Sequence, residues 1–276
     1  MTRPPDVLPS LRAYRPVQLE GLIRVGRDFD GGYVLPGPLI EKCHALLSLG
    51  VNDDWSLEEG LLAHNPALRV TCVDGTTGMG RILRKTAQKS VDMLGHLLTL
   101  QIAKFRRNAR YLAKPLAFRR FFSRHELLPL MVAGTAAPGA ITLPALLERI
   151  TRGDAGSWVI LKSDIEGAEF EVLPGSIRHM GQVAVLLIEF HRLDLHWEAF
   201  VGCMSALMQA FHVAHVHGNN FDGCIPGTQV PITLEVTLVN KALAPGDLPA
   251  VAKSYPLPGL DMPNTRKRPD LPLNFE

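Results

Sequence analysis

The sequence predicts an α/β fold with an open, mostly parallel sheet, an antiparallel C-terminal strand and helices on both faces. The clearest observation is the stretch 158–175, WVILKSDIEGAEFEVLPG. Its first four residues are apolar and β-favouring, as in a strand buried on both faces, and residues 168–173 have helical spacing. Asp164, Glu166 and Glu169 fall at this junction. Carboxylates therefore cluster where open α/β sheets bind their ligands, at the carboxyl end of a strand.

Length and composition fit one large α/β domain. The chain has 276 residues and is 46% hydrophobic, which is enough for a sizeable core. We expect an N-terminal arm over 1–23, a basic helical insertion over 79–126 and a proline-rich tail over 242–276. The four cysteines lack CxxC spacing, which argues against a zinc site or disulfide framework and favours reduced thiols in the cytoplasm. No apolar signal segment and no run of about eighteen apolar residues is present.

The first strand–turn–helix unit begins the predicted sheet. A core strand is expected at 44–49, then a loop at 50–56 and a helix that Ser56 could cap together with Glu59, as in a capping box. The start of such a helix favours a bound anionic group. Before this unit, an Asp-Gly-Gly turn within 28–35 predicts a hairpin or strand entry.

The second predicted strand, 68–73, ends at Asp74, about twenty residues after the first turn. An acid there can accept hydrogen bonds from both hydroxyls of a ribose, although a turn residue before Gly75 is the alternative. The first turn has one glycine, Gly50, and Asn52 stands where a dinucleotide-binding loop would have another. We therefore expect Gly50 and Asp74 to define the adenosine side of a nucleoside site, and a dinucleotide fits less well.

Residues 79–124 form a strongly basic segment, with twelve Lys and Arg against one acid, Asp92. Its apolar residues recur close to every 3.6 positions and predict a long amphipathic helix ending near Pro115. These residues are Val91, Leu94, Leu98, Ile102, Phe105, Ala109 and Leu112. A solvated lid or dimer surface is one interpretation. The other is an anionic partner: a phosphorylated or acidic glycan, a membrane surface or, last because no aromatic-interleaved signature is present, nucleic acid.

The remaining segments continue the pattern. The strand at 183–188 ends in Glu189, Phe190 and His191, so two neighbouring strands deliver Asp164 and Glu189 to one edge of the sheet. The other expected elements are a third strand, a small-residue loop that could pass close to an adenine, two helices and an antiparallel strand pair. They lie, in that order, at 127–133, 134–139, 141–152, 195–211, 212–217 and 232–240.

Several of these segments, in this order, resemble the FkbM-like family of S-adenosylmethionine (SAM) dependent methyltransferases. The stretch 158–175 resembles the family's D-x-E-G-x-E turn between a strand and a helix. The other matching segments are RVGRDFDGGYVL, LLSLGVNDDWSLEE, CVDGT, ITLPALL, LLIEFH, HVHGNN and LEVTLVNK. The resemblance implies a Rossmann-like methyltransferase sheet and SAM as the cofactor. It does not extend to 79–134 or to the two termini.

The resemblance and the residues together define a candidate site. The residues expected to bind SAM are Gly50, Asn52, Asp53, Asp74, Asp164 and Glu189. The candidate catalytic residues are His191, Asp164 and Glu166. His191 is the first candidate for a general base because imidazole titrates near neutral pH, and Asp164 is the second. Asp164, Glu189 and His191 could instead hold magnesium or manganese, but no metal is assigned.

The resulting hypothesis is a SAM-dependent methyltransferase that O-methylates a sugar, glycan or secondary metabolite, the O-methyl preference being implied by the family. Two other functions stay open at this point. One is a nicotinamide-dependent oxidoreductase, which would use the same sheet but lacks the glycine fingerprint. The other is a non-catalytic module that docks an anionic partner through the basic helix.

Overall fold

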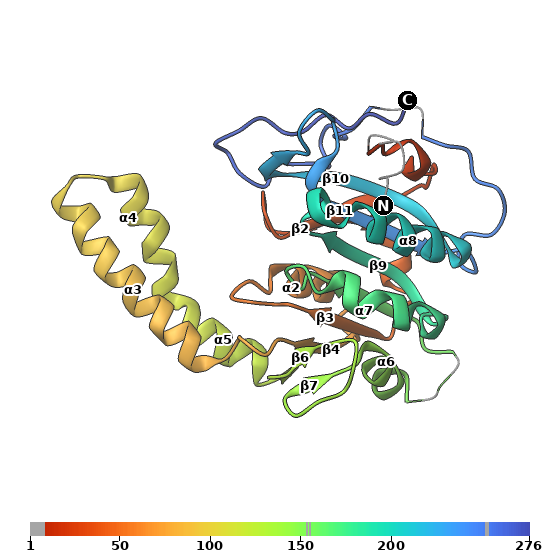
Figure 1. Ribbon diagram of the computed structural model, residues 1–276. Helices are drawn as coiled ribbons and strands as arrows, with labels where there is room; N and C mark the ends of the chain where they lie inside the picture. The colour runs from red at the N-terminus through yellow and green to blue at the C-terminus, as the bar shows by residue number, and fades with distance from the viewer. Residues whose placement is uncertain (1–8, 153, 155, 252–253) are drawn as a thin grey trace, which may run out of the picture.

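The structure is a computed structural model that describes residues 9–152, 154, 156–251 and 254–276. Its centre is a seven-stranded sheet of order β10-β11-β9-β8-β3-β4-β5 (Figure 1). The strands are β3 (Ala45–Leu49), β4 (Arg69–Val73), β5 (Glu126–Leu128), β8 (Val159–Ser163), β9 (Val183–Phe190), β10 (Phe211–Cys224) and β11 (Pro231–Asn240). All neighbouring pairs are parallel except those made by β11. The predicted fold class, including the reversed C-terminal strand, is confirmed.

The central strands are apolar on both faces because both faces are covered. Every residue of β3, β8 and β9 is buried. Within β3, Leu47 and Leu49 pack into one hydrophobic cluster and Leu46 into the other, following the two-residue period of a strand. Leu49 is in register with both Val73 and Ser163. The carboxyl ends of β3, β4 and β8 are therefore level with one another.

Helices cover both faces of the sheet, as predicted. One cluster contains residues of α6 (Leu143–Thr151), α7 (Glu169–Ser176) and α8 (Leu193–Ala210); the other contains residues of α2 (Ser56–His64). Short helical segments α1 (Gly37–Ile40), η1 (Arg12–Tyr14) and η3 (Ile177–His179) complete the body. The predicted capping box is wrong. Trp55 is the N-cap residue and makes no side-chain cap, while the Ser56 hydroxyl accepts a hydrogen bond from the Arg27 N–H.

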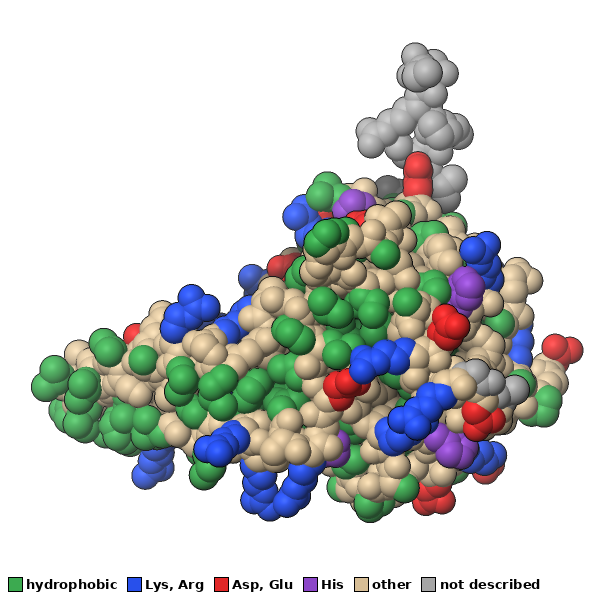
Figure 2. Space-filling view, turned by 90° about the horizontal axis from the view of Figure 1, so that it is seen from below, with side chains coloured by type: hydrophobic (Ala, Val, Ile, Leu, Met, Phe, Trp, Pro, Cys, Tyr) green, Lys and Arg blue, Asp and Glu red, His purple; other side chains and the backbone are tan. Residues whose placement is uncertain are grey.

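The basic insertion is a helical hairpin that projects from the body (Figure 1). It consists of α3 (Met79–Leu98), α4 (Ile102–Ala109), η2 (Arg110–Ala113) and α5 (Lys114–Phe122). The single long helix predicted here is wrong, because the chain reverses at Leu100, whose φ is +55°. The 3.6-residue period continues on the returning helix, so spacing alone could not show the turn. Pro115 lies in the first turn of α5 instead of ending a helix, since a first-turn residue needs no N–H partner. Figure 2 shows hydrophobic side chains gathered on this hairpin.

Two further predicted segments, at 28–35 and 127–133, lie at the edge of the central sheet or outside it. The predicted hairpin is present as β1 (Leu22–Gly26) paired with β2 (Gly32–Pro36). The predicted strand at 127–133 is wrong in part: it divides into β5 and into β6 (Met131–Val132), which pairs with β7 (Ala140–Ile141) in a separate sheet. Pro129 lies at the break and has no N–H for a sheet hydrogen bond.

The terminal segments pack along the body where they are described. Val17 bridges Ala250, and Tyr255 bridges Leu273. The part of the expected arm at 1–8 and positions 252–253 of the expected tail lie outside the described residues. No helix within the described chain combines the length and apolar character needed to cross a bilayer.

Candidate active site

The strand order creates a crevice between β3 and β8. From β3 the chain proceeds to β4 and β5 on one side of the sheet, and then crosses to β8 and β9 on the other. Open α/β sheets bind ligands at such a switch point, outside the carboxyl ends of the strands. Gly50 follows β3, Asp164 follows β8 and Asp74 follows β4, so the structure brings these three predicted site residues to one edge.

Gly50 is required by a close approach of two loops. Its φ is +75°, and a Cβ atom placed on it would lie 1.7 Å from the carbonyl oxygen of Asp164. The Gly50 N–H donates to the Val73 carbonyl (3.0 Å), and the Asp164 N–H donates to the Leu49 carbonyl (3.2 Å). The first bond ties the loop after β3 to the end of β4, and the second ties the loop after β8 to the end of β3. The single glycine retained in the first turn is therefore where the backbone needs one.

Two cavities meet at this junction. The first, here called the β4 cavity, has a volume of about 280 Å³ and is lined by Asp74 and by apolar groups of Met131, Ile165 and Ala168. The second, the β9 cavity, has a volume of about 310 Å³ and a polar lining. Its lining includes Arg27, Asp30, Asp53, Glu58, Lys162, Glu189, His191 and Asn219. Both cavities are bordered by Gly50, Asn52, Asp164 and Glu166.

The predicted cofactor residues therefore divide between the cavities. Asp74 lines the β4 cavity alone, whereas Asp53 and Glu189 line the β9 cavity alone. The small-residue loop at 134–139, expected near an adenine, lines neither cavity; the segment before it, 130–132, lines the β4 cavity instead.

The Asp74 carboxylate already organises its own turn. Its Oδ1 accepts the N–H groups of Thr76 (2.7 Å) and Thr77 (3.0 Å), and its Oδ2 accepts the Asn52 N–H (2.7 Å). The two threonine hydroxyls also donate to it. Burial would raise the pKa of Asp74, but these donors hold the pKa below its usual value. Each carboxylate oxygen has two acceptor positions, and the threonine hydroxyls can rotate away. Two N–H groups fill Oδ1 and one N–H group occupies Oδ2, so Asp74 can accept one ribose hydroxyl, on Oδ2, and not the two expected.

The start of α2 does not offer the anion site that the sequence predicts. The Ser56 N–H already donates to Asp54 Oδ1 (3.3 Å). Asp53 lies beside it and forms an ion pair with Lys85 of the hairpin (2.8 Å). Burial would raise the pKa of Asp53, but the hydrogen bond and charge of Lys85 lower it. Negative side chains thus occupy this helix end, and a bound carboxylate would be repelled there.

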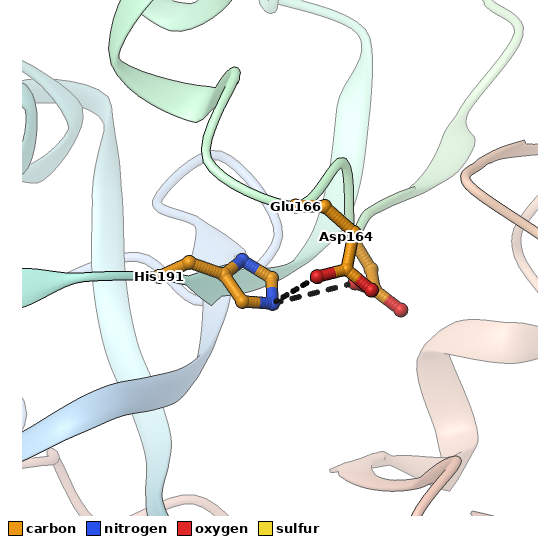
Figure 3. Close-up of side chains that lie close together, drawn as sticks. All are labelled: Asp164, Glu166 and His191. Atoms are coloured by element: carbon orange, nitrogen blue, oxygen red, sulfur yellow. Dashed lines mark ion pairs between the residues drawn. The ribbon is translucent and has the colours of Figure 1, made fainter. Parts of the chain in front are cut away.

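His191 lies in a cage of four carboxylates, two of which, Asp164 and Glu166, are drawn in Figure 3. Its Nε2 is 3.8 Å from Asp164 Oδ1 and 3.8 Å from Glu166 Oε2, and 3.9 Å from Glu189 Oε1. Its Nδ1 is 3.0 Å from Oε1 of Glu169, a fully buried carboxylate. Burial lowers the pKa of His191, but the Glu169 hydrogen bond and the surrounding charges raise it to about 9. The ring is therefore an imidazolium at neutral pH. His191 can act as the predicted general base only when the surrounding negative charge is reduced and its pKa falls.

The other members of the cage differ in exposure. The Glu166 side chain is 82% exposed and its φ is +55°, whereas Glu189 is buried and accepts a hydrogen bond from the Asn219 amide (2.8 Å). Burial and the nearby Asp164 raise the pKa of Glu189 well above its usual value. Asp164 is intermediate, with a side chain 25% exposed.

The residues whose geometry could coordinate a divalent cation differ from the set expected from the sequence. Asp164, Glu166 and His191 offer ligand atoms that all lie within 4.8 Å of one another in the described chain, whereas the sequence pointed to Glu189 in place of Glu166. Two carboxylates and one imidazole are a donor set that magnesium or manganese accepts. The same groups serve equally well as hydrogen-bonding groups, so no metal is assigned.

Lys162 is the main site residue that sequence reasoning missed. Its Nζ donates to the Gly50 carbonyl (2.8 Å) and to Asp164 Oδ2 (3.0 Å), which ties the tips of β3 and β8 together. Burial would lower its pKa, but Asp164 and Glu58 raise it, so the ammonium stays charged. The available signal was a lysine inside an otherwise apolar strand, two residues before the first carboxylate.

Comparisons with known proteins give distant structural likenesses. No protein-family model matches the chain, and no curated sequence relative is found. A Methanococcus jannaschii fibrillarin pre-rRNA processing protein is 11% identical, with a TM-score of 0.36, over 73% of this chain and 68% of that chain. A precorrin-6y C5,15-methyltransferase from Geobacter metallireducens is 12% identical, with a TM-score of 0.36, over 72% and 82%. The mitomycin 7-O-methyltransferase MmcR is 13% identical, with a TM-score of 0.32, over 74% and 52%. At these TM-scores none of the three defines the activity or the substrate of this chain.

Proposed function

We propose that this protein is a SAM-dependent methyltransferase that acts on a hydroxyl of a sugar, glycan or secondary metabolite. The observation that carries the proposal is the meeting of two cavities at the β3–β8 switch point, with Gly50, Asn52, Asp164 and Glu166 on the border of both. Group transfer requires two ligands held with their reacting atoms in line, and most of the rate gain comes from that positioning. The O-methyl preference comes from the FkbM-like resemblance.

The β4 cavity suits the nucleoside half of the cofactor. Apolar groups of Met131, Ile165 and Ala168 can cover an adenine ring, and Asp74 Oδ2 has one acceptor position for a ribose hydroxyl. The carboxylates at the border of the cavities favour a cation. Bound SAM would supply a methyl group made electrophilic by a positively charged sulfonium. The methionine carboxylate needs a cation, and Arg27 on the β9 cavity can serve only by exchanging its present ion pairs with Asp54 (2.8 Å) and Asp30 (3.3 Å) for one with the ligand.

The chain's own residues then set up the acceptor. Lys162 holds Asp164 Oδ2 and the Gly50 carbonyl, which fixes both borders of the cavities. Asp164 Oδ1 is the better placed proton acceptor, because His191 already carries a proton at neutral pH. In this arrangement the His191 imidazolium, whose Nε2 is 3.8 Å from that oxygen, stabilises the ionised carboxylate. Glu169 fixes the orientation of the ring from the buried side.

A thermal-shift comparison separates this proposal from the oxidoreductase alternative. We expect SAM and S-adenosylhomocysteine to raise the melting temperature, since a ligand that binds only the folded state stabilises it. Stabilisation by NAD or NADP alone would overturn the proposal.

Radiolabelled methyl transfer to panels of hydroxyl and amine acceptors tests the chemistry. Asp164→Asn should lower kcat by about 10²- to 10⁴-fold while S-adenosylhomocysteine still binds. Asp247→Asn, a change at an exposed position of the C-terminal segment, is the matched control and should leave kcat unchanged. Undiminished turnover by Asp164→Asn would contradict the assigned base, and transfer to amines alone would contradict the acceptor class.

A further inference from the structure

The helical hairpin carries its apolar stripe on the outside. Leu83, Ala87, Val91, Leu94 and Leu98 repeat at helical spacing along α3, and all five are exposed. The exposed fractions reach 68% at Val91 and 85% at Leu98. In a globular protein such a stripe normally faces the core. Here it is exposed to solvent, and Figure 2 shows hydrophobic side chains along the projecting hairpin.

The tip of the hairpin is the most apolar part of this surface. Leu98 ends α3, Leu100 lies in the turn and Ile102 begins α4, with exposed fractions of 85%, 80% and 46%. Leu97 beside them is 48% exposed. Exposed apolar patches of this kind mark interaction surfaces. The tip lies at the end of the projection, away from the sheet (Figure 1).

Positive charge surrounds the apolar surface. The segment 79–124 holds twelve of the 29 Lys and Arg of the chain and one of its 27 Asp and Glu, a net charge of +11, so the rest of the chain is at −9. In the described part of the segment, the ion pairs with acids are those of Lys85 with Asp53 and of Lys89 with Asp92. Arg84, Lys104, Arg106 and Arg110 are exposed. The cations are therefore available to an anionic partner.

We propose that the α3–α4 hairpin docks on a lipid bilayer that bears anionic headgroups. The tip leucines enter the interfacial region, and the flanking Lys and Arg contact headgroup phosphates. This proposal is independent of the methyltransferase chemistry.

A second copy of the chain fits the hairpin less well than a bilayer does. Two hairpins placed together would bring two +11 segments into contact. Contact with the acidic body would require an apolar counterpart there. Outside the hairpin and α5, the large apolar side chains exposed in the described chain are the scattered Met131, Leu195 and Phe221.

Vesicle flotation tests the proposal with the full chain. We expect binding to mixed phosphatidylcholine–phosphatidylserine vesicles that weakens at high salt, and little binding to phosphatidylcholine alone. The double variant Leu98→Asp, Leu100→Asp should bind at least about a hundredfold more weakly, because burial of each of the two leucines contributes roughly a tenfold factor or more. Lys104→Ala and Arg106→Ala should each weaken binding by about fivefold. Leu195→Asp, at an exposed position of α8, should bind like the wild type.

Failure to bind either kind of vesicle would overturn the proposal. Unchanged binding of the tip variant, Leu98→Asp with Leu100→Asp, would also overturn it, because vesicle binding would then depend on surface charge alone. Light scattering of the same variants without lipid measures their oligomeric state and so tests the alternative partner, a second copy of the chain. A wild-type dimer that the tip variant converts to a monomer would assign the hairpin to that second copy. Circular dichroism checks folding, and Leu100→Trp provides a second measurement, since its emission should shift to the blue only on anionic vesicles.

Discussion

Replacing Gly50 by alanine tests whether the two sheet-edge loops must touch. The new Cβ would lie 1.7 Å from the Asp164 carbonyl oxygen, and contacts below 3.0 Å are essentially never tolerated, so the loops must separate by about 1.3 Å. That shift breaks the 2.8 Å hydrogen bond from Lys162 to the Gly50 carbonyl and the 3.2 Å bond from the Asp164 N–H to Leu49. At roughly 1 to 2 kcal/mol for each bond, the variant should lose about 3 kcal/mol of unfolding free energy.

Urea unfolding followed by circular dichroism measures this loss. Gly167→Ala is the matched control, because Gly167 has a φ of +103° in the loop after β8 but its Cβ would meet no atom within 4 Å. It reports the cost of the backbone conformation alone. S-adenosylhomocysteine binding, measured by calorimetry, should weaken in Gly50→Ala, whose loops border both cavities. A Gly50→Ala variant no less stable than Gly167→Ala would refute the close contact between the two loops.

Three further predictions concern histidines and the core. His217 is buried between two carboxylates that raise its pKa to about 10, so its stabilising contribution is complete below pH 6.5 and is lost as the pH rises through 10. Between pH 7 and 10 the wild type should lose roughly 4 kcal/mol more unfolding free energy than His217→Gln, and equal losses would contradict this. Glu169→Gln should lower the pKa of His191 from about 9 by at least about one unit in an NMR titration; an unchanged value would show that the buried carboxylate does not set it. Phe200→Ala should cost about 3 to 4 kcal/mol in urea unfolding, and Leu195→Ala, at a position 65% exposed, less than about 0.5; similar losses would remove Phe200 from the core.

Much of the fold was predictable because the central strands are continuous apolar runs. β8 and β9 are buried along their whole length, and this burial dictates their composition. The errors arose where one pattern fits two structures. The helical period of 79–124 suits a hairpin as well as one helix, and only the turn at Leu100 distinguishes them. Likewise, the run at 127–133 looks like one strand until Pro129 interrupts its hydrogen bonding.

The position of the site was predictable from the sequence, but the protonation state of its side chains was not. The carboxyl ends of β3, β4 and β8 bring Gly50, Asp74 and Asp164 together, as the strand-end rule requires. The same rule brought Asp164 and Glu189 to the edge where His191 lies, but it did not report the 3.0 Å contact between His191 and the buried Glu169 of α7, which raises the pKa of the ring. Lys162 was missed for a similar reason, because its partners lie on two different loops.

Calorimetric titration with S-adenosylhomocysteine, comparing wild type with Ala168→Trp, tests the central claim most directly. Ala168 lines the β4 cavity, so an indole there should fill the space assigned to the adenine. Ala63→Trp, at an exposed position of α2, is the matched control. We predict binding to the wild type and to Ala63→Trp, and at least a hundredfold loss in Ala168→Trp, which corresponds to about 2.8 kcal/mol. Equal affinity in all three proteins would place the nucleoside elsewhere and contradict the account.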